Sequence, residues 1–387
     1  MAFFIGRDRE ARRAYGFDEI ALVPGDVTVN PDEVDISLSI GDVKLPIPFL
    51  ASAMDGVVDV GFAIAMGKAG GLGVLNLDGI SSRYEKPREV LTAIAAANPE
   101  EATKLLQEVY RKPVQEELIA QRVKEIKAAK VPCAVSCIPQ NAERFGPIAE
   151  KAGCDVFVVQ STVATVRHKA ERYKPFDIAR FVKERDIPVV VGNVVTYSVA
   201  VELMEAGASA LLVGVGPGAA CTTRGVLGLG VPQVTATVDC AAARDYHYKR
   251  CGRYVPMITD GGMSTGGDIC KAIACGSDGV MVGSAFARTK EAPGQGFHWG
   301  MATPHANLPR GTRIQVGVTG TLEEILFGPS RLDDGSQNLV GALRTCMGSV
   351  GATTIREMQT TEIVIAPSIK TEGKLFQKAQ RIGMGKG

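Results

Sequence analysis

The sequence has no excess of charge of either sign. Its 387 residues include 43 Lys and Arg against 42 Asp and Glu, which gives a formal net charge of +1. A dense basic run with interleaved aromatic side chains, which is typical of proteins that bind nucleic acids, is also missing. We therefore expect no nucleic-acid partner.

Long hydrophobic runs are absent as well. Residues 208–216 form one of the longest apolar runs, and it is far shorter than the roughly 20 residues that a membrane-spanning helix needs. In the first 13 residues the charged side chains follow a very short apolar patch, which is the wrong order for a secretory signal. We expect no membrane partner and a cytoplasmic location.

Cysteine is present, but not in the pattern of a disulfide framework or a zinc site. The nine cysteines are an odd number, and several stand in apolar contexts, which favours reduced thiols. Cys133 and Cys137 form one close pair, and Cys270 and Cys275 form another. Neither pair has a histidine at zinc-site spacing, so we expect no structural zinc.

What the sequence does contain is a series of eight short apolar runs bounded by glycine or proline. The runs do not alternate apolar with polar residues, which is typical of strands buried on both faces. Helical patterns such as 59–70 and 198–208 lie between them. The series predicts a closed (β/α)8 TIM barrel, with an open doubly wound sheet as the alternative. The runs are 48–54, 71–76, 132–137, 155–160, 188–192, 210–215, 256–260 and 279–284.

Three segments of this single catalytic domain, residues 1–387, lie outside the repeating pattern. Residues 1–47 contain polar β-type stretches and turns, and we expect them to cap the N-terminal end of the barrel. Residues 77–131 are charged and predict inserted helices. Residues 291–387 are rich in Gly, Pro and Thr, with a helix-like stretch near 336–348. Their composition suits a mobile flap, a C-terminal tail and a subunit contact.

Polar and glycine residues follow the predicted strands, at the end of a TIM barrel where the chemistry takes place. The glycine-rich loop 213–225, VGVGPGAACTTRG, places Cys221 there. Backbone N–H groups of such a loop stabilise a thiolate, which favours a nucleophile over a packing residue. The other strand-end residues are Ser52, Asp55, Asn76, Gln160, Ser161, Asn193, Asp260, Gly283 and Ser284.

The ends of the seventh and eighth runs match the usual phosphate position of a barrel. Glycines at 261, 262 and 283 would let an anion approach backbone N–H groups. Asp260 would repel a phosphate, so a sugar diol is its better partner. Each glycine taken singly is compatible with a simple tight turn, but together these strand ends predict a sugar-phosphate ligand.

Several motifs together resemble the IMP dehydrogenase / GMP reductase family over about residues 15–290, and more loosely beyond. They are ASAMD at 51–55, GNVVT at 192–196, GVGPGAACTTR at 214–224, TDGGMSTGGDICKAIACGSDGVMVGS at 259–284 and EAPG at 291–294. Members of the family often carry CBS modules between the second and third strands, where this chain has only residues 77–131. The chain therefore resembles a CBS-less, dehydrogenase-like branch without regulation through such modules.

The resemblance implies oxidation of inosine 5′-monophosphate (IMP) to xanthosine 5′-monophosphate, with NAD as the hydride acceptor, in guanine nucleotide biosynthesis. Cys221 would attack C2 of the purine, Thr223 would assist proton transfer, and Asp260 would hold the ribose hydroxyls. The residues implied to line the phosphate, the sugar and the base are Ser52, Met54, Asn193, Gly218, Gly262, Gly283 and Ser284, with Gly300, Met301 and Ala302 over the hypoxanthine.

The resemblance also implies cofactor sites and an assembly. Gln160 and Ser161 stand where the family has an Asp-Ser pair that faces the nicotinamide ribose. Carbonyl groups of Gly216, Gly218 and Cys221 would bind a monovalent cation such as K⁺. Residues 372–373 of a neighbouring subunit would supplement that site. The family habit is a homotetramer or octamer.

Two departures keep alternatives open. The family's Arg-Tyr pair, which activates water, is missing between residues 291 and 330, so Arg310, Arg313 or His305 would have to replace it. Val316 stands where the family carries Glu or Gln. The second interpretation is a GMP reductase that uses NADPH. A reductase would carry a glutamate near Val316, and that glutamate is missing here. A purine-nucleotide-binding protein without turnover is the third. His298 would either stack near the substrate or pack beside Trp299.

Overall fold

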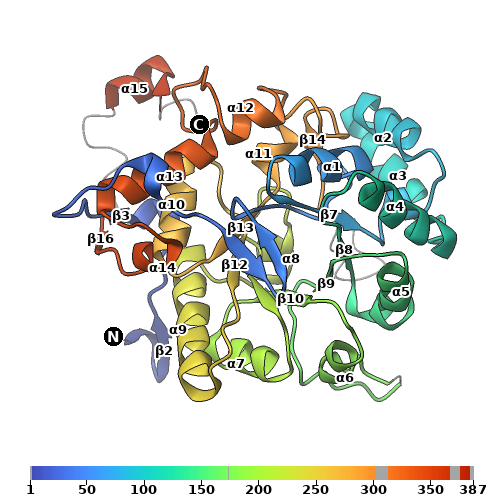
Figure 1. Ribbon diagram of the computed structural model, residues 1–387, viewed down its shortest axis with the longest axis horizontal. Coiled ribbons are helices and arrows are strands. Elements are labelled where there is room, and N and C mark those ends of the chain that lie inside the picture. Colours follow the sequence, from blue (N-terminus) through green and yellow to red (C-terminus); the bar gives the residue numbers. More distant parts are fainter. Residues whose placement is uncertain (1, 173, 301–312, 367–374, 384–387) are drawn as a thin grey trace.

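Eight parallel strands close into a barrel in the computed structural model, which describes residues 2–172, 174–300, 313–366 and 375–383 (Figure 1). Each strand pairs with the next along the chain, and the last closes on the first, with Val280 opposite Phe49. The predicted TIM barrel is confirmed, and the open sheet is wrong. The strands are β6 (Phe49–Ala51), β7 (Leu72–Asn76), β8 (Ala134–Cys137), β9 (Val156–Gln160), β10 (Val189–Val194), β11 (Ala210–Val213), β12 (Met257–Asp260) and β13 (Gly279–Val282).

Burial on both faces explains why the barrel strands are continuously apolar. Val156 and Val158 belong to the same hydrophobic cluster as Leu50, inside the barrel. Phe157 and Val159, which alternate with them, belong to the cluster between the strands and the helices. Because neither face meets water, the sequence shows no polar alternation.

Helices surround the barrel (Figure 1). Helix α4 (Glu116–Ala128) packs against both α1 (Val60–Lys68) and α5 (Pro139–Lys151), so it is the barrel's own second helix. Within residues 77–131, only α2 (Pro87–Ala96) and α3 (Pro99–Val109) are added. We call residues 87–109, which form α2 and α3, the α2–α3 insertion. The helices are α1 (Val60–Lys68), α2 (Pro87–Ala96), α3 (Pro99–Val109), α4 (Glu116–Ala128), α5 (Pro139–Lys151), α6 (Ile178–Lys183), α7 (Tyr197–Glu205), α8 (Thr223–Leu227), α9 (Gln233–Cys251) and α10 (Gly266–Ala274).

A short hairpin, β4 (Leu38–Ile40) and β5 (Val43–Leu45), closes the N-terminal end of the barrel. Leu38, Ile40 and Leu45 join the hydrophobic cluster of the barrel interior. Leu38 also lies against Gly279, the first residue of β13. The hairpin does not cover the opposite end of the barrel, where the strands finish and where the predicted site residues lie.

The rest of the two terminal segments packs outside the barrel. Strand β3 (Ile20–Leu22) pairs with β16 (Ile363–Ile365), so the N-terminal and C-terminal segments lie side by side there. Arg12, in the hairpin β1 (Ala2–Gly6) and β2 (Arg9–Arg12), forms an ion pair with Asp239 of α9. The C-terminal elements are α11 (Ser284–Ala287), β14 (Phe297–His298), β15 (Ile314–Gln315), α12 (Leu322–Leu326), α13 (Leu339–Val350), α14 (Ile355–Met358) and α15 (Leu375–Gln380).

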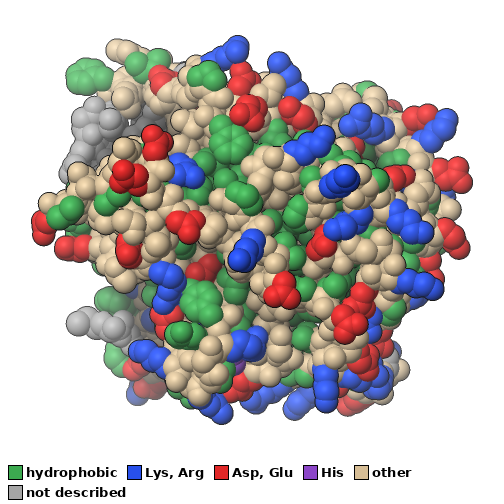
Figure 2. Space-filling view, viewed as in Figure 1, with side chains coloured by type: hydrophobic (Ala, Val, Ile, Leu, Met, Phe, Trp, Pro, Cys, Tyr) green, Lys and Arg blue, Asp and Glu red, His purple; other side chains and the backbone are tan. Residues whose placement is uncertain are grey.

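The surface carries both signs of charge. Acidic and basic side chains are intermixed over the face seen in Figure 2, without a large area of one sign. Among the described residues, no helix is both long enough and apolar enough to cross a membrane.

Candidate active site

The glycine-rich loop after β11 carries Cys221 to the end of the barrel where the strands finish. Gly214 and Gly216 have φ angles of +144° and +75°, which side chains other than glycine rarely adopt. Cys221 is exposed, whereas the side chain of Thr223, in the first turn of α8, is 2% exposed. The thiol donates a hydrogen bond to Oγ1 of Thr223 at 3.2 Å. The loop thus presents an accessible sulfur beside a hydroxyl held by packing.

Arg224 braces the same loop. Its guanidinium donates to the carbonyl oxygen of Val215 at 3.4 Å and to that of Val231 at 2.9 Å. A Cβ on Gly216 would lie 2.6 Å from Cγ of Arg224, so the arginine stem fills the space that the glycine leaves. The sequence reasoning missed this role, although Arg224 ends the CTTR motif.

The cysteine loop packs against the turn that follows β12. Gly261 and Gly262 have φ angles of +85° and +80°. A Cβ on either residue would lie within 3.2 Å of the ring of Pro217. Glycine is therefore required twice here, for its conformation and for the close approach of the two loops. The predicted nucleophile loop and the predicted sugar-phosphate turn are neighbours.

Asp260, at the end of β12, accepts hydrogen bonds from two side chains of other strand ends. Nδ2 of Asn193 lies 2.8 Å from its Oδ2, and Nε2 of Gln160 lies 3.0 Å from the same atom. Burial raises the pKa of Asp260 to about 6, although both hydrogen bonds lower it. Gln160, expected at the nicotinamide ribose, therefore has its amide in contact with the residue expected to hold the substrate ribose.

A second group of predicted residues meets where β13 closes on β6. The backbone N–H of Ser52 donates to the carbonyl of Val282 at 3.0 Å. A Cβ on Gly283 would lie 3.1 Å from Sδ of Met54 and 3.6 Å from Oγ of Ser52. The residues predicted to bind phosphate and base therefore come together across this pair of strands.

His298 lies beside this group. Its Nε2 is 3.2 Å from Oγ of Ser284, and its side chain is 1% exposed. Burial, with a smaller contribution from Arg288, lowers the pKa of His298 to about 4. Its Nδ1 has no hydrogen-bond partner among the described residues. The imidazole is thus neutral near pH 7 and can either donate to or accept from Ser284.

Arg313, one of the candidates for activating water, binds the end of a helix. Its guanidinium donates to the carbonyl oxygens of Ile94, Ala95 and Ala97, at the C-terminus of α2. It also stacks 4.3 Å from the ring centroid of Phe297. These contacts give Arg313 a structural role. The other predicted residues Met301, Ala302, His305, Arg310 and 372–373 lie outside the described residues.

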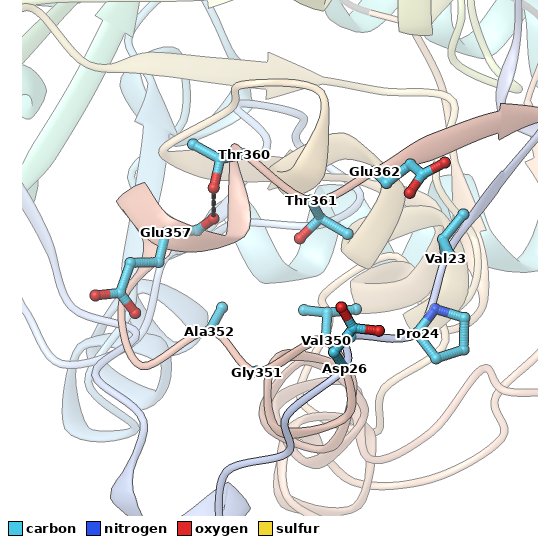
Figure 3. Close-up of a pocket in the computed structure, with 11 residues that line it drawn as sticks. Val23, Pro24, Asp26, Val350, Gly351, Ala352, Glu357, Thr360, Thr361 and Glu362 are labelled. Atoms are coloured by element: carbon cyan, nitrogen blue, oxygen red, sulfur yellow. Dashed lines mark hydrogen bonds between the residues drawn. The ribbon is translucent and has the colours of Figure 1, made fainter.

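One pocket lies away from the site. It has a volume of about 420 Å³ and lies beside β3, β16 and the C-terminal end of α13. Asp26, Glu357, Thr360 and Glu362 are among its lining residues (Figure 3). None of the predicted site residues lines it, so it has no part in the chemistry proposed below.

The described residues contain no cluster of three or more His, Cys, Asp or Glu side chains that could hold a metal ion. All nine cysteines are free thiols.

Known proteins match this chain along most of its length. A family profile described as IMP dehydrogenase / GMP reductase domain covers residues 14–373. An uncharacterised oxidoreductase of Mycobacterium tuberculosis is 39% identical over 370 residues, covering 93% of this chain and 99% of the relative. The inosine-5′-monophosphate dehydrogenase of Borreliella burgdorferi is 30% identical, covering 90% of this chain and 92% of the relative.

A solved structure agrees with these matches. The crystal structure of an IMP dehydrogenase/GMP reductase-like protein from Corynebacterium glutamicum superimposes with a TM-score of 0.89 at 34% identity, covering 94% of this chain and 97% of the other. The expected family resemblance is confirmed. This oxidoreductase belongs to the IMP dehydrogenase / GMP reductase family.

Proposed function

We propose that the protein oxidises IMP to xanthosine 5′-monophosphate with NAD, through a covalent bond to Cys221. The observation that carries the proposal is the exposed thiol of Cys221, hydrogen-bonded to the buried hydroxyl of Thr223 at the rim of the barrel. A positioned thiol beside a proton acceptor is the arrangement that nucleophilic catalysis needs. The dehydrogenase named among the relatives supports the same reaction.

The nucleotide would lie along the strand ends from β12 to β6. Asp260 would accept hydrogen bonds from the ribose hydroxyls, with Asn193 orienting the carboxylate. The phosphate and sugar would lie at Ser52, Gly218, Gly262, Gly283 and Ser284, because glycine lets an anion approach backbone N–H groups. Met54 and Asn193 would lie nearer the base and Gly300 would lie over it, so that C2 faces Cys221.

The reaction has two stages. The sulfur of Cys221 would bond to C2 of the hypoxanthine while Thr223 takes up the thiol proton, and C2 would lose its hydrogen as a hydride, for which NAD would be the acceptor. Water then adds to C2 and the carbon–sulfur bond breaks, which releases the product and returns a proton to the sulfur. The first stage is nucleophilic catalysis, and the second needs a general base.

Two bound groups complete the proposal. NAD, when bound, supplies the hydride acceptor, and Gln160 and Ser161 would face its ribose. The hydroxyl of Ser161 donates to the carbonyl of Val163 at 2.9 Å, which orients it beside Gln160. A K⁺ ion would be held by carbonyl groups of Gly216, Gly218 and Cys221. The carbonyl of Gly218 accepts from the N–H of Cys221 at 3.0 Å, and its second lone pair fits a cation.

The proposal extends to the setting of the enzyme. We expect a homotetramer or octamer that acts in the cytoplasm, in the biosynthesis of guanine nucleotides. Sedimentation of the purified chain, with and without IMP, would check the assembly.

One pair of assays separates the proposal from its two alternatives. The purified protein is incubated with IMP and NAD, and separately with GMP and NADPH, while the near-ultraviolet absorbance of the reduced nicotinamide is followed. Formation of NADH supports the proposal, whereas loss of NADPH identifies a GMP reductase. Tight binding of IMP without turnover in either assay identifies a nucleotide-binding protein.

A further inference from the structure

The α2–α3 insertion has a small hydrophobic core of its own, and one member comes from far along the chain. Trp299, the single tryptophan of the sequence, is fully buried in that core. It lies directly before Gly300, which is predicted to cover the base. The core consists of Ile80, Leu91, Ile94, Leu106, Val109, Tyr110 and Trp299.

One hydroxyl group joins three parts of the molecule. The indole Nε1 of Trp299 donates to the hydroxyl of Tyr110 at 2.8 Å. The hydroxyl of Tyr110, at the end of α3, donates to Oδ2 of Asp55 at 2.5 Å. Asp55 stands just after β6, next to Met54, and also accepts from the N–H of Ile80 at 2.9 Å. Tyr110 therefore connects the insertion, the mouth of the barrel and the segment of Trp299.

Further contacts bind the same segment, residues 295–300, to the insertion and to the loop that follows β6. Nε2 of Gln295 donates to Oγ1 of Thr92 in α2 at 3.3 Å. Gly56 approaches so closely that a Cβ there would lie 2.7 Å from the carbonyl oxygen of Phe297. Figure 1 shows β14 next to α2, in agreement with these contacts.

The position of Trp299 determines the position of its neighbours. His298, one residue earlier, reaches Ser284 at the predicted phosphate end of the site. Gly300 follows immediately. The three residues are consecutive, so displacement of the Trp299 backbone would carry His298 and Gly300 with it.

We propose that Tyr110 is a positioning residue for the nucleotide site. Through Trp299 it holds His298 against Ser284 and Gly300 over the base, so that the α2–α3 insertion sets the affinity for the nucleotide. The affinity claim depends on the proposed function, because IMP is its ligand. The claim about Trp299 can be tested without a ligand.

The first test measures the unliganded protein. Trp299 is the only tryptophan, so its fluorescence reports its environment directly. Tyr110→Phe removes the hydroxyl that accepts from the indole, and we expect emission at longer wavelength and stronger quenching by acrylamide. Tyr84→Phe is the matched control: Tyr84 packs against the same core, and its hydroxyl donates to the carbonyl of Val109 at 3.0 Å, whereas the indole N–H of Trp299 donates to Tyr110. We expect its fluorescence to match that of the wild type.

The second test measures the dissociation constant and the KM for IMP. Tyr110→Phe leaves the carboxylate of Asp55 and the indole N–H each with one hydrogen bond fewer, and we expect about tenfold weaker IMP binding, with kcat reduced less than KM is raised. Trp299→Phe, which keeps an aromatic ring in the core, should weaken binding in the same direction. If Tyr110→Phe does not fold, Trp299→Phe still tests whether this contact sets the affinity for IMP.

The outcomes separate cleanly. If Tyr110→Phe and Tyr84→Phe lower the melting temperature equally and weaken IMP binding equally, Tyr110 is only a structural residue and the proposal is wrong. Unchanged quenching and unchanged KM in Tyr110→Phe would also overturn it. If the wild type neither binds nor converts IMP, the proposed function fails, while the quenching comparison still decides whether Tyr110 holds Trp299.

Discussion

The thiol of Cys221 donates a 3.2 Å hydrogen bond to the hydroxyl of Thr223, two residues further along the chain. The sulfur is exposed, whereas the hydroxyl belongs to a side chain that is 2% exposed. Packing therefore fixes the proton acceptor, and the nucleophile remains open to a substrate. This division of roles can be tested one residue at a time.

Replacing Cys221 with Ala should abolish turnover. The sulfur forms the bond to the purine, so we expect kcat to fall by at least about a thousandfold. The affinity for IMP should stay within about tenfold, because an exposed thiol contributes little binding surface. Steady-state rates and calorimetric titration with IMP measure both. Cys251→Ala, at the other exposed cysteine, is the control, and full activity of Cys221→Ala would remove the sulfur from the mechanism.

Replacing Thr223 with Val removes the proton acceptor but keeps the branched shape. We expect kcat to fall by about 10- to 100-fold, because general acid–base assistance is lost while the nucleophile stays. Rapid-mixing measurements of NADH formation would show which stage is slowed. Thr222→Val, at the exposed neighbour, should leave the rate nearly unchanged. Equal effects of the two substitutions would contradict a specific role of Thr223.

Replacing Asp260 with Asn should stabilise the protein at pH 8 and weaken nucleotide binding. The pKa of Asp260 is raised to about 6 from an ordinary value of 3.8. Folding therefore favours the protonated form. The stabilisation that this form contributes to the folded protein is fully present below pH 4 and is lost as the pH rises through 6. At pH 8 the neutral amide of Asn avoids the free-energy cost of holding a carboxylate at this half-buried position. Because solvent still reaches the group, we expect that cost to be about 1–2 kcal/mol.

Thermal melts at pH 4 and pH 8 measure the effect of Asp260→Asn. We expect a higher melting temperature than the wild type at pH 8 and almost no difference at pH 4, together with IMP affinity reduced by about 10- to 100-fold through loss of a charged acceptor for the ribose. Asp42→Asn, at an exposed carboxyl of the β4–β5 hairpin, is the control. A pH-independent change in stability would contradict the raised pKa.

Replacing Gly56 with Ala should destabilise the protein and disturb the segment that carries Trp299. The added Cβ would lie 2.7 Å from the carbonyl oxygen of Phe297 and 3.0 Å from Cα of His298, so backbone atoms would have to shift to accommodate it. We expect a loss of about 1–3 kcal/mol in the free energy of unfolding, measured by urea titration. Gly225→Ala is the matched control, since no heavy atom lies within 4 Å of its added Cβ. A neutral Gly56→Ala would show that the segment is loosely held.

The barrel could be predicted because its signal is local. Each strand is an apolar run such as 156–160, ended by glycine or a polar residue, and the closed barrel buries both faces of every run. Cys221 could be placed at the rim for the same reason, because its loop follows the strand Ala210–Val213 directly. The structure then put α4 into the ring of barrel helices, which its charged sequence does not distinguish from an inserted helix.

The amino-acid sequence by itself determined the strands, their order and the set of glycines and polar side chains that follow them, because each of these depends on neighbours within a few residues. Tertiary structure alone decided which side chains meet. Gln160 reaches Asp260 across 100 residues of chain, and Trp299 reaches Tyr110 across 189. Such contacts arise only when the barrel closes and the insertion folds over its rim, and no local pattern encodes the distance between them.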